Sequence, residues 1–120
     1  MINQVVVAVV LVDTAMPLLD DYITDVLMRD LVGHDHKPVS FLVYLWLAAE
    51  QGRAKTEVRA SYQQIAESVG ISKSSAQSAV RWLLRRKLLS VEKETATAIP
   101  VYTVRTPWRD SARHLMGKAR

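Results

Sequence analysis

The spacing of apolar residues divides the chain into strand-like and helical segments. An unbroken apolar stretch over residues 5–12, rich in valine, predicts a buried β-strand. Between residues 18 and 32 apolar side chains recur three and four positions apart, which predicts a helix that Gly33 ends and whose first turn suits Pro17. The apolar face of this helix is expected to consist of Leu19, Tyr22, Ile23, Val26, Leu27 and Leu31.

A second helix is predicted after a polar link over residues 34–37. Pro38 suits its first turn, and the helix is expected to reach about Gln51, with Gly52 at its end. The charged residues 53–60 then predict a loop with a short strand over residues 57–60. The second helix is apolar on nearly every side, which predicts heavy burial of Phe41, Leu42, Tyr44, Leu45, Trp46 and Leu47.

Two short helices joined by a tight turn are predicted after residue 60. Ser61 and Gln64 have the spacing of a capping box, which marks the beginning of a helix. The small Ala66 permits the close approach of another helix, and Gly70 supplies the left-handed conformation that ends the first one. Ser72 then caps the second helix. The apolar side chains of the first helix and of the turn are Ile65, Val69 and Ile71.

A helical projection of residues 73–85 separates an apolar face from a polar and cationic one. The apolar face, which is expected to contact the core, consists of Ala76, Ala79, Val80, Leu83 and Leu84. In a helix-turn-helix, the second helix offers its outward face to the major groove of DNA. The candidate DNA-contacting residues at its beginning and along that face are Ser72, Lys73, Ser74, Gln77, Ser78, Arg81 and Arg85.

After Lys87 the apolar residues alternate with polar ones at every second position. Residues 88–92 and 99–105 are predicted to be two strands joined by a loop around residues 94–97. Lys93, near the tip of this hairpin, is a further candidate for contact with the DNA backbone or the minor groove. We expect Arg85 to contact a phosphate, whereas for Arg86 and Lys87 a phosphate contact and a solvated helix end are equally good interpretations.

The pattern as a whole predicts an α+β fold that is mainly helical. Residues 38–105 form the predicted winged helix-turn-helix domain, and residues 1–37 form a strand and helix extension. Residues 106–120 are a basic tail, predicted to be a short helix that packs on the core, lies along DNA or contacts a second subunit. Packing is favoured, because tryptophan is commonly an anchor. The apolar positions of the tail are Trp108, Ala112, Leu115 and Met116.

Charge is distributed unevenly. Residues 1–50 carry two basic and seven acidic side chains, whereas residues 51–120 carry fourteen basic and five acidic ones, so that net charges of −5 and +9 give the total of +4. This asymmetry favours a polyanion as partner of the second part, although a solvated charged surface explains it equally well. Residues 5–12 are too few to span a bilayer, which takes about 20 apolar residues.

Residues 61–89, SYQQIAESVGISKSSAQSAVRWLLRRKLL, together with the hairpin that follows, resemble the winged helix-turn-helix superfamily of bacterial GntR-like and MarR-like regulators. They are also similar to helix-turn-helix modules of phage and plasmid replication proteins. The resemblance covers residues 38–105. It implies that Lys73, Ser74, Gln77, Ser78 and Arg81 match the positions that face DNA.

No catalytic site is expected. The sequence has no cysteine, no nucleophile-elbow pattern and no phosphate-cradling glycine loop, so we expect neither an enzyme nor a cofactor. The pair His34 and His36 around Asp35 has ligand chemistry, but it stands in a polar link without further ligands nearby, and a metal is not expected there.

We therefore expect a protein that binds double-stranded DNA in a sequence-specific manner and acts as a transcriptional regulator. The alternatives are a replication or partition protein of a phage or plasmid, and a winged helix that binds proteins without DNA affinity. Residues 1–37 are the expected homodimer interface, since an exposed apolar strand must be covered. The alternative is that this strand pairs with the wing sheet of its own subunit. The expected location is the cytoplasm, at the nucleoid and away from membranes. The sequence leaves open the operator, any small-molecule effector and the sign of regulation.

Overall fold

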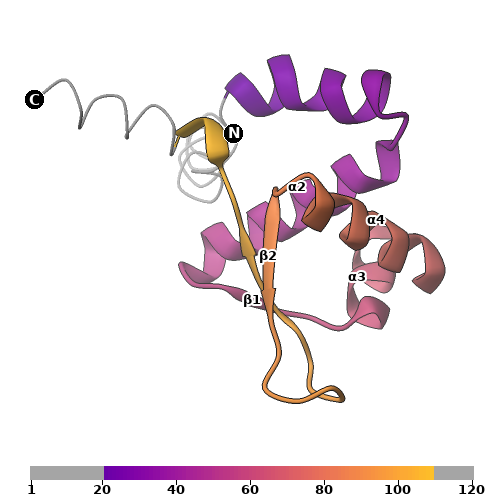
Figure 1. Cartoon of the computed structure of the whole chain (residues 1–120), viewed down its shortest axis with the longest axis vertical. Helices are drawn as coiled ribbons and strands as arrows, with labels where there is room; N and C mark the ends of the chain where they lie inside the picture. The colour runs from indigo at the N-terminus through magenta and orange to yellow at the C-terminus, as the bar shows by residue number, and fades with distance from the viewer. Residues whose placement is uncertain (1–20, 110–120) are drawn as a thin grey trace, which may run out of the picture.

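The computed structural model describes residues 21–109 of the chain. These residues form an α+β structure that is mainly helical and includes a three-stranded antiparallel sheet. Figure 1 shows the N-terminal helical segment across one end of the molecule, and the tip of the β2–β3 hairpin at the opposite end. The predicted strand over residues 5–12 lies outside the described residues, as do Pro17, Leu19, Ala112, Leu115 and Met116.

The N-terminal helical segment has π-type hydrogen bonding over η1 (Ile23–Leu27) and η2 (Arg29–His34). It buries Ile23, Leu27 and Leu31, as predicted. Tyr22 and Val26, which were expected on the same face, are instead 38% and 43% exposed. The reason is the wider turn of a π-helix, which keeps residues four positions apart close to one face and moves those three apart away from it.

Gly33 does not end this segment, contrary to the prediction. It lies inside η2, and the backbone first adopts a left-handed conformation at His36, with φ of 57°. The link between the two helical segments is therefore residues 35–37, whereas residues 34–37 were predicted. Its Lys37 N–H donates to the Leu31 carbonyl at 2.8 Å, which fixes the direction in which the next helix begins.

Helix α2 (Pro38–Ala54) begins at the predicted proline and continues past the predicted end. Gly52 lies within it, and Lys55 supplies the left-handed cap with φ of 57°. Leu42, expected to be buried, is 48% exposed, because it faces away from the core that covers Phe41, Val43 and Tyr44. α2 is therefore heavily buried on most of its circumference but not on all of it.

The last turns of α2 are fastened to the sheet. The Gln51 side chain accepts a hydrogen bond from the Val104 N–H at 2.7 Å and donates one to the Val104 carbonyl at 3.4 Å. The Tyr44 hydroxyl donates to the Arg105 carbonyl at 3.1 Å. These bonds satisfy backbone groups at the end of strand β3 (Val101–Val104) and hold α2 against the sheet.

The sheet has the strand order β1-β3-β2, and its neighbouring strands are antiparallel. β1 (Val58–Arg59) lies within the short strand expected over residues 57–60. β2 (Leu89–Glu92) and β3 form the predicted hairpin, with Leu89 opposite Val104 and Glu92 opposite Val101. Lys87, with φ of 60°, turns the chain from the preceding helix toward β2.

Helices α3 (Tyr62–Val69) and α4 (Lys73–Arg85) have the predicted caps. The Ser61 hydroxyl accepts a hydrogen bond from the Gln64 N–H, and the Gln64 side chain accepts one from the Ser61 N–H, which completes the capping box. Gly70 is left-handed, with φ of 87°, and its N–H donates to the Ala66 carbonyl at 2.9 Å. Ser72 caps α4 by accepting from the Ser75 N–H at 3.1 Å.

The core lies between α2, α3, α4 and one side of the sheet. The side chains predicted for the apolar face of α4 are in it, with Ala76, Val80 and Leu83 wholly enclosed and Ala79 nearly so, while Leu84 is half-buried. The described N-terminal segment and Trp108 also pack against this core. In residues 21–109 no helix is long and apolar enough to cross a membrane.

Gly33, inside η2, and Gly70, at the end of α3, provide a matched test of backbone strain. A Cβ atom added at Gly70 or at Gly33 meets nothing within 4 Å, and only Gly70 has a positive φ. Gly70→Ala is expected to lower the free energy of unfolding by about 1–2 kcal/mol through conformational strain alone. Gly33→Ala should raise it by about 0.5–1 kcal/mol, because alanine favours a helix.

Urea denaturation of the two variants and the wild type measures both effects. Equal losses of stability in the two variants would contradict the assignment of the left-handed turn to Gly70.

Candidate nucleic-acid interface

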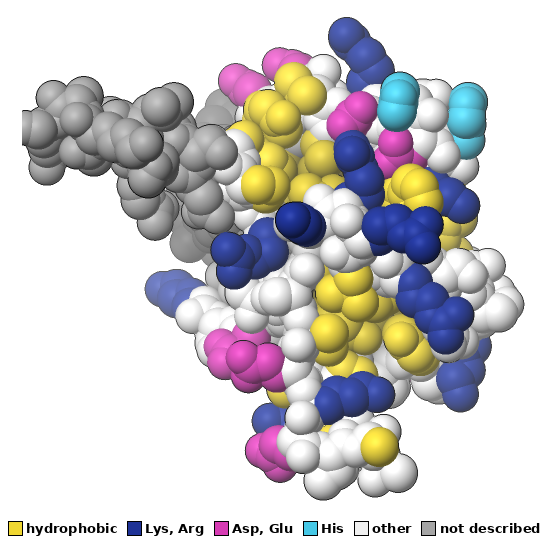
Figure 2. All heavy atoms as spheres, in the orientation of Figure 1, with side chains coloured by type: hydrophobic (Ala, Val, Ile, Leu, Met, Phe, Trp, Pro, Cys, Tyr) yellow, Lys and Arg dark blue, Asp and Glu magenta, His cyan; other side chains and the backbone are white. Residues whose placement is uncertain are grey.

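The outward face of α4 presents a row of polar and basic side chains. Burial of the opposite face leaves this one free of the core, and the row continues from the first turn of the helix to the last. Gln77 is half-buried, whereas the other predicted side chains on this helix are exposed: Lys73, Ser74, Ser78, Arg81 and Arg85. Figure 2 shows lysine and arginine side chains gathered over the face of the molecule that carries α4.

Ser72 has a structural function at the beginning of α4. Its hydroxyl accepts the hydrogen bond from the Ser75 N–H, and its oxygen lies 2.8 Å from the Ser75 hydroxyl and 3.2 Å from that of Ser74. The residue is exposed, but its oxygen is occupied by the cap. A DNA contact from Ser72 would therefore share an oxygen on which the helix already depends.

Lys93 lies apart from the α4 residues, directly after β2 and near the tip of the hairpin, where it is exposed. The structure thus places the predicted residues in two groups, one at α4 and one on the hairpin. Since β2 follows α4 after a short turn at Lys87, both groups belong to a continuous stretch of chain from residue 72 to residue 93.

Trp82 joins the outward face to the rest of the molecule. The Lys37 Nζ lies 5.0 Å from the centroid of the Trp82 ring, and the guanidinium carbon of Arg85 lies 5.8 Å from it. Two cations therefore lie beside one aromatic ring. Lys37 comes from the residue before α2 and was not among the predicted site residues. Its ammonium group adds a positive charge next to α4 that only the folded chain brings there.

The carboxylate of Asp35 holds the inner edge of Trp82 and the end of α4. One oxygen accepts from the Trp82 indole N–H at 2.9 Å and from the Arg86 Nε at 3.1 Å, and the other lies 2.9 Å from the His34 Nδ1. The Asp35 side chain is only 5% exposed. Both oxygens of the residue that was considered above for a metal are thus engaged by protein donors.

Arg86 is committed to this network and not to the outward face. Besides the contact with Asp35, its Nη2 forms an ion pair with Asp30 at 2.5 Å. The sequence left a phosphate contact and a solvated helix end open for this residue. The structure adds two acidic partners from the N-terminal segment, while the Arg86 side chain stays exposed. Some of the acidic residues before residue 50 therefore form ion pairs with a basic residue of the second part of the chain.

The network lowers the pKa of the Asp35 carboxyl below its usual value of 3.8. Burial by itself raises this pKa, but the hydrogen bonds from His34 and Trp82 and the positive charge of Arg86 outweigh it. Asp35 therefore stabilises the fold in its ionised form.

Sequence reasoning found the side chains on α4 and missed Asp35, Trp82 and Lys37. Periodicity marks a helix face, but the contacts of Asp35 with Trp82 and Arg86 join residues 47 and 51 positions apart. The one available signal was the excess of acidic residues before residue 50, which indicated that some had cationic partners later in the chain.

Comparisons of the chain with models of protein families, with curated proteins and with solved structures gave no significant match.

The Asp35 network predicts a loss of stability in acid. The pKa of Asp35 is lower in the folded than in the unfolded protein. Its contribution to the free energy of unfolding is therefore present at a pH above the unfolded pKa of 3.8, and it disappears as the pH falls through the folded pKa. Asp35→Asn is expected to lower the free energy of unfolding at pH 7 by about 1–3 kcal/mol, since it weakens charge-assisted hydrogen bonds at a buried position.

Urea denaturation between pH 7 and pH 2.5 measures this contribution. The difference between the wild type and Asp35→Asn should shrink toward the acid end. Asp25→Asn, at an exposed position of the same helical segment, is the matched control and should have little effect. A difference between the wild type and Asp35→Asn that stays constant over this range would show that the charge of Asp35 does not stabilise the fold.

Proposed function

We propose that this protein binds double-stranded DNA in a sequence-specific manner as a winged helix-turn-helix, with α4 as the recognition helix in the major groove and the β2–β3 hairpin as the wing. The observation that carries the proposal is the exposed, cationic outward face of α4. A capped helix and a turn at Gly70 precede α4, and an antiparallel hairpin follows it. This order of elements is typical of proteins that read DNA with the second helix.

Each side chain of the face has a chemistry that suits a part of the duplex. Lys73 and Arg81 are donors that match the two acceptors of guanine, and the Gln77 amide matches adenine. Ser74 and Ser78 are short enough to contact either a base edge or a phosphate. Arg85, beside the Trp82 ring, and Lys93 on the hairpin are assigned to phosphates on the flanks.

The charge of the described surface supports DNA over a protein as partner of this face. The exposed side chains of α4 between Lys73 and Arg85 include no acidic residue. A helix that binds a protein does not require such a cationic row, whereas a helix that binds a polyanion does. Regulation of transcription is the use we propose, and replication or partition of a mobile element is the alternative with the same interface.

The proposal predicts that Arg81→Ala weakens binding to the preferred duplex by about 1–3 kcal/mol if Arg81 reads a base. The preferred duplex is first obtained by selection of bound fragments from random DNA, and its affinity is then measured by fluorescence anisotropy over a range of salt concentrations. Affinity should fall steeply with salt.

Arg53→Ala is the matched control for this experiment, because it removes an exposed arginine that pairs with Glu50 near the far end of α2. This variant should bind as the wild type does. Binding that is indifferent to both salt and Arg81→Ala would contradict the proposed function.

We propose further that the protein acts as a homodimer joined through its N-terminal segment. The apolar side chains of Tyr22, Val26, Met28 and Val32 are each between 38% and 43% exposed on one short helical segment, a concentration that a second copy would cover. Light scattering at micromolar concentration should give the mass of a dimer, and the selected DNA should contain two symmetric half-sites.

Val26→Asp is expected to convert the dimer to a monomer without unfolding it, because the position is exposed. Ile99→Asp, at a comparably exposed position on the hairpin, should leave the dimer intact. A wild-type protein that is monomeric under these conditions would show that the dimer proposal is wrong.

A further inference from the structure

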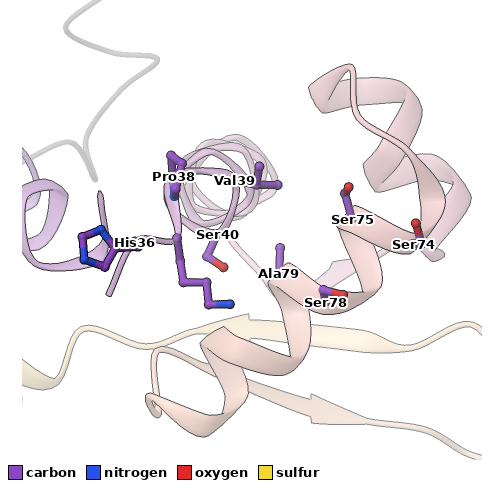
Figure 3. A pocket seen from close by; sticks show the side chains of 9 residues that line it. His36, Pro38, Val39, Ser40, Ser74, Ser75, Ser78 and Ala79 are labelled. Atoms are coloured by element: carbon purple, nitrogen blue, oxygen red, sulfur yellow. The ribbon is translucent and has the colours of Figure 1, made fainter. Parts of the chain in front are cut away.

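A groove lies between the first turn of α2 and the N-terminal half of α4. Its volume is about 260 Å³, which is below the roughly 300–1,000 Å³ of pockets that hold drug-sized molecules. Figure 3 shows the side chains of its two walls: residues 36–40 on the side of α2, and Ser74, Ser75, Ser78 and Ala79 on the side of α4. The lining includes Lys37 and His36 but no acidic residue, so the groove suits a small anionic group.

The hydroxyl of Ser40 lacks a partner in this groove. Ser40 is 2% exposed, lines the groove, and forms no side-chain hydrogen bond within the described part of the chain. Figure 3 shows its side chain directed from α2 into the space between the two helices. Among the described residues no fully enclosed side-chain nitrogen or oxygen lacks a partner, so the Ser40 hydroxyl is accessible from the groove. It can therefore donate to an acceptor that enters the groove.

The backbone around Ser40 also favours an anion. No side chain caps the beginning of α2, and Pro38 has no N–H, so the first-turn N–H groups of Val39 and Ser40 lack a side-chain cap. The positive end of the dipole of this helix of 17 residues lies at the same place. The side chain of Lys37, whose Nζ lies 5.0 Å from the centroid of the Trp82 ring, brings a full positive charge toward α4.

We propose that this groove binds one phosphate of the DNA backbone, with the Ser40 hydroxyl, the Lys37 ammonium group and the first-turn amides of α2 as its donors. The inference rests on the proposed function. Ser74 and Ser78, which form the opposite wall, belong to the α4 face assigned to the major groove. A duplex seated on that face has its backbone beside the groove, and the phosphate contact would fix the angle at which α4 enters.

Two variants test the contact. Ser40→Ala should weaken binding to duplex DNA about three- to tenfold, since it removes one hydrogen-bond donor. Lys37→Gln should weaken it about tenfold and reduce the slope of log affinity against log salt by about 0.9, the value for one phosphate. Both effects should be the same for the selected duplex and for random duplex DNA, because a phosphate contact does not read sequence.

Three controls accompany these variants. Lys37→Arg keeps the charge beside Trp82 and should restore most of the affinity. Lys55→Gln removes an exposed lysine at the other end of α2, and Ser68→Ala removes an exposed serine of α3; both should bind as the wild type does. Urea denaturation of each variant verifies that the fold is intact.

The outcomes separate this inference from the proposed function. If the wild type binds duplex DNA, and Ser40→Ala and Lys37→Gln bind it equally well with an unchanged salt slope, the phosphate contact is wrong and the proposed function stands. If the wild type binds no duplex DNA, the proposed function fails and the backbone contact fails with it.

Inorganic phosphate, titrated into ¹⁵N-labelled protein, distinguishes a backbone phosphate from a free one. Shifts of the Val39 and Ser40 amides that saturate in the wild type and vanish in Ser40→Ala would support the donors assigned here. The same shifts, combined with DNA binding that the variants do not change, would assign the groove to a free phosphate and overturn the backbone contact.

Discussion

The buried carboxylate of Asp35 is the interaction on which the arrangement of the described elements depends. It accepts hydrogen bonds from Trp82, on the last turn of α4, and from Arg86, at the cap of that helix. It stands three residues before helix α2 begins. One negative charge thus fixes the N-terminal segment, the entrance to α2 and the end of α4 relative to one another. Because that charge is nearly excluded from water, loss of any partner would leave a buried polar group without compensation.

Local signals in the sequence were sufficient for the region from Ser61 to Ser72. A capping box, a left-handed glycine and a second cap act within a few residues of each other, so their geometry follows from neighbouring side chains. Glycine alone was a poor guide elsewhere. Gly33 and Gly52 both lie inside helices, and the left-handed positions belong to His36 and Lys55. There tertiary contacts, such as those of Gln51 with Val104, decide where the helix ends.

The part of the candidate site that follows from helical periodicity could be predicted from the sequence. The exposed face of α4 follows from the burial of the opposite face, and both could be read from the spacing of residues 73–85. The arrangement of charges around that face could not be read from this spacing. Whether a basic residue is ion-paired depends on residues far away in the chain. Arg86 is paired with Asp30 and Asp35, and Lys37 is brought beside Trp82. The groove at Ser40 likewise arises only when two helices meet.

The strand order β1-β3-β2 has a consequence for how the chain folds. β1 precedes α3, and its partner β3 is the last strand, so the pairing of Val58 with Tyr102 closes a loop that contains α3, α4 and β2. Closing such a loop costs chain entropy before the contact is gained, and only two residue pairs join these strands. Helices α3 and α4 and the hairpin follow one another closely in the sequence, whereas β1 reaches β3 only through this long-range pairing. Because α3 and α4 also pack against α2 in the common core, this short pairing ties together the two ends of a segment that the core already holds.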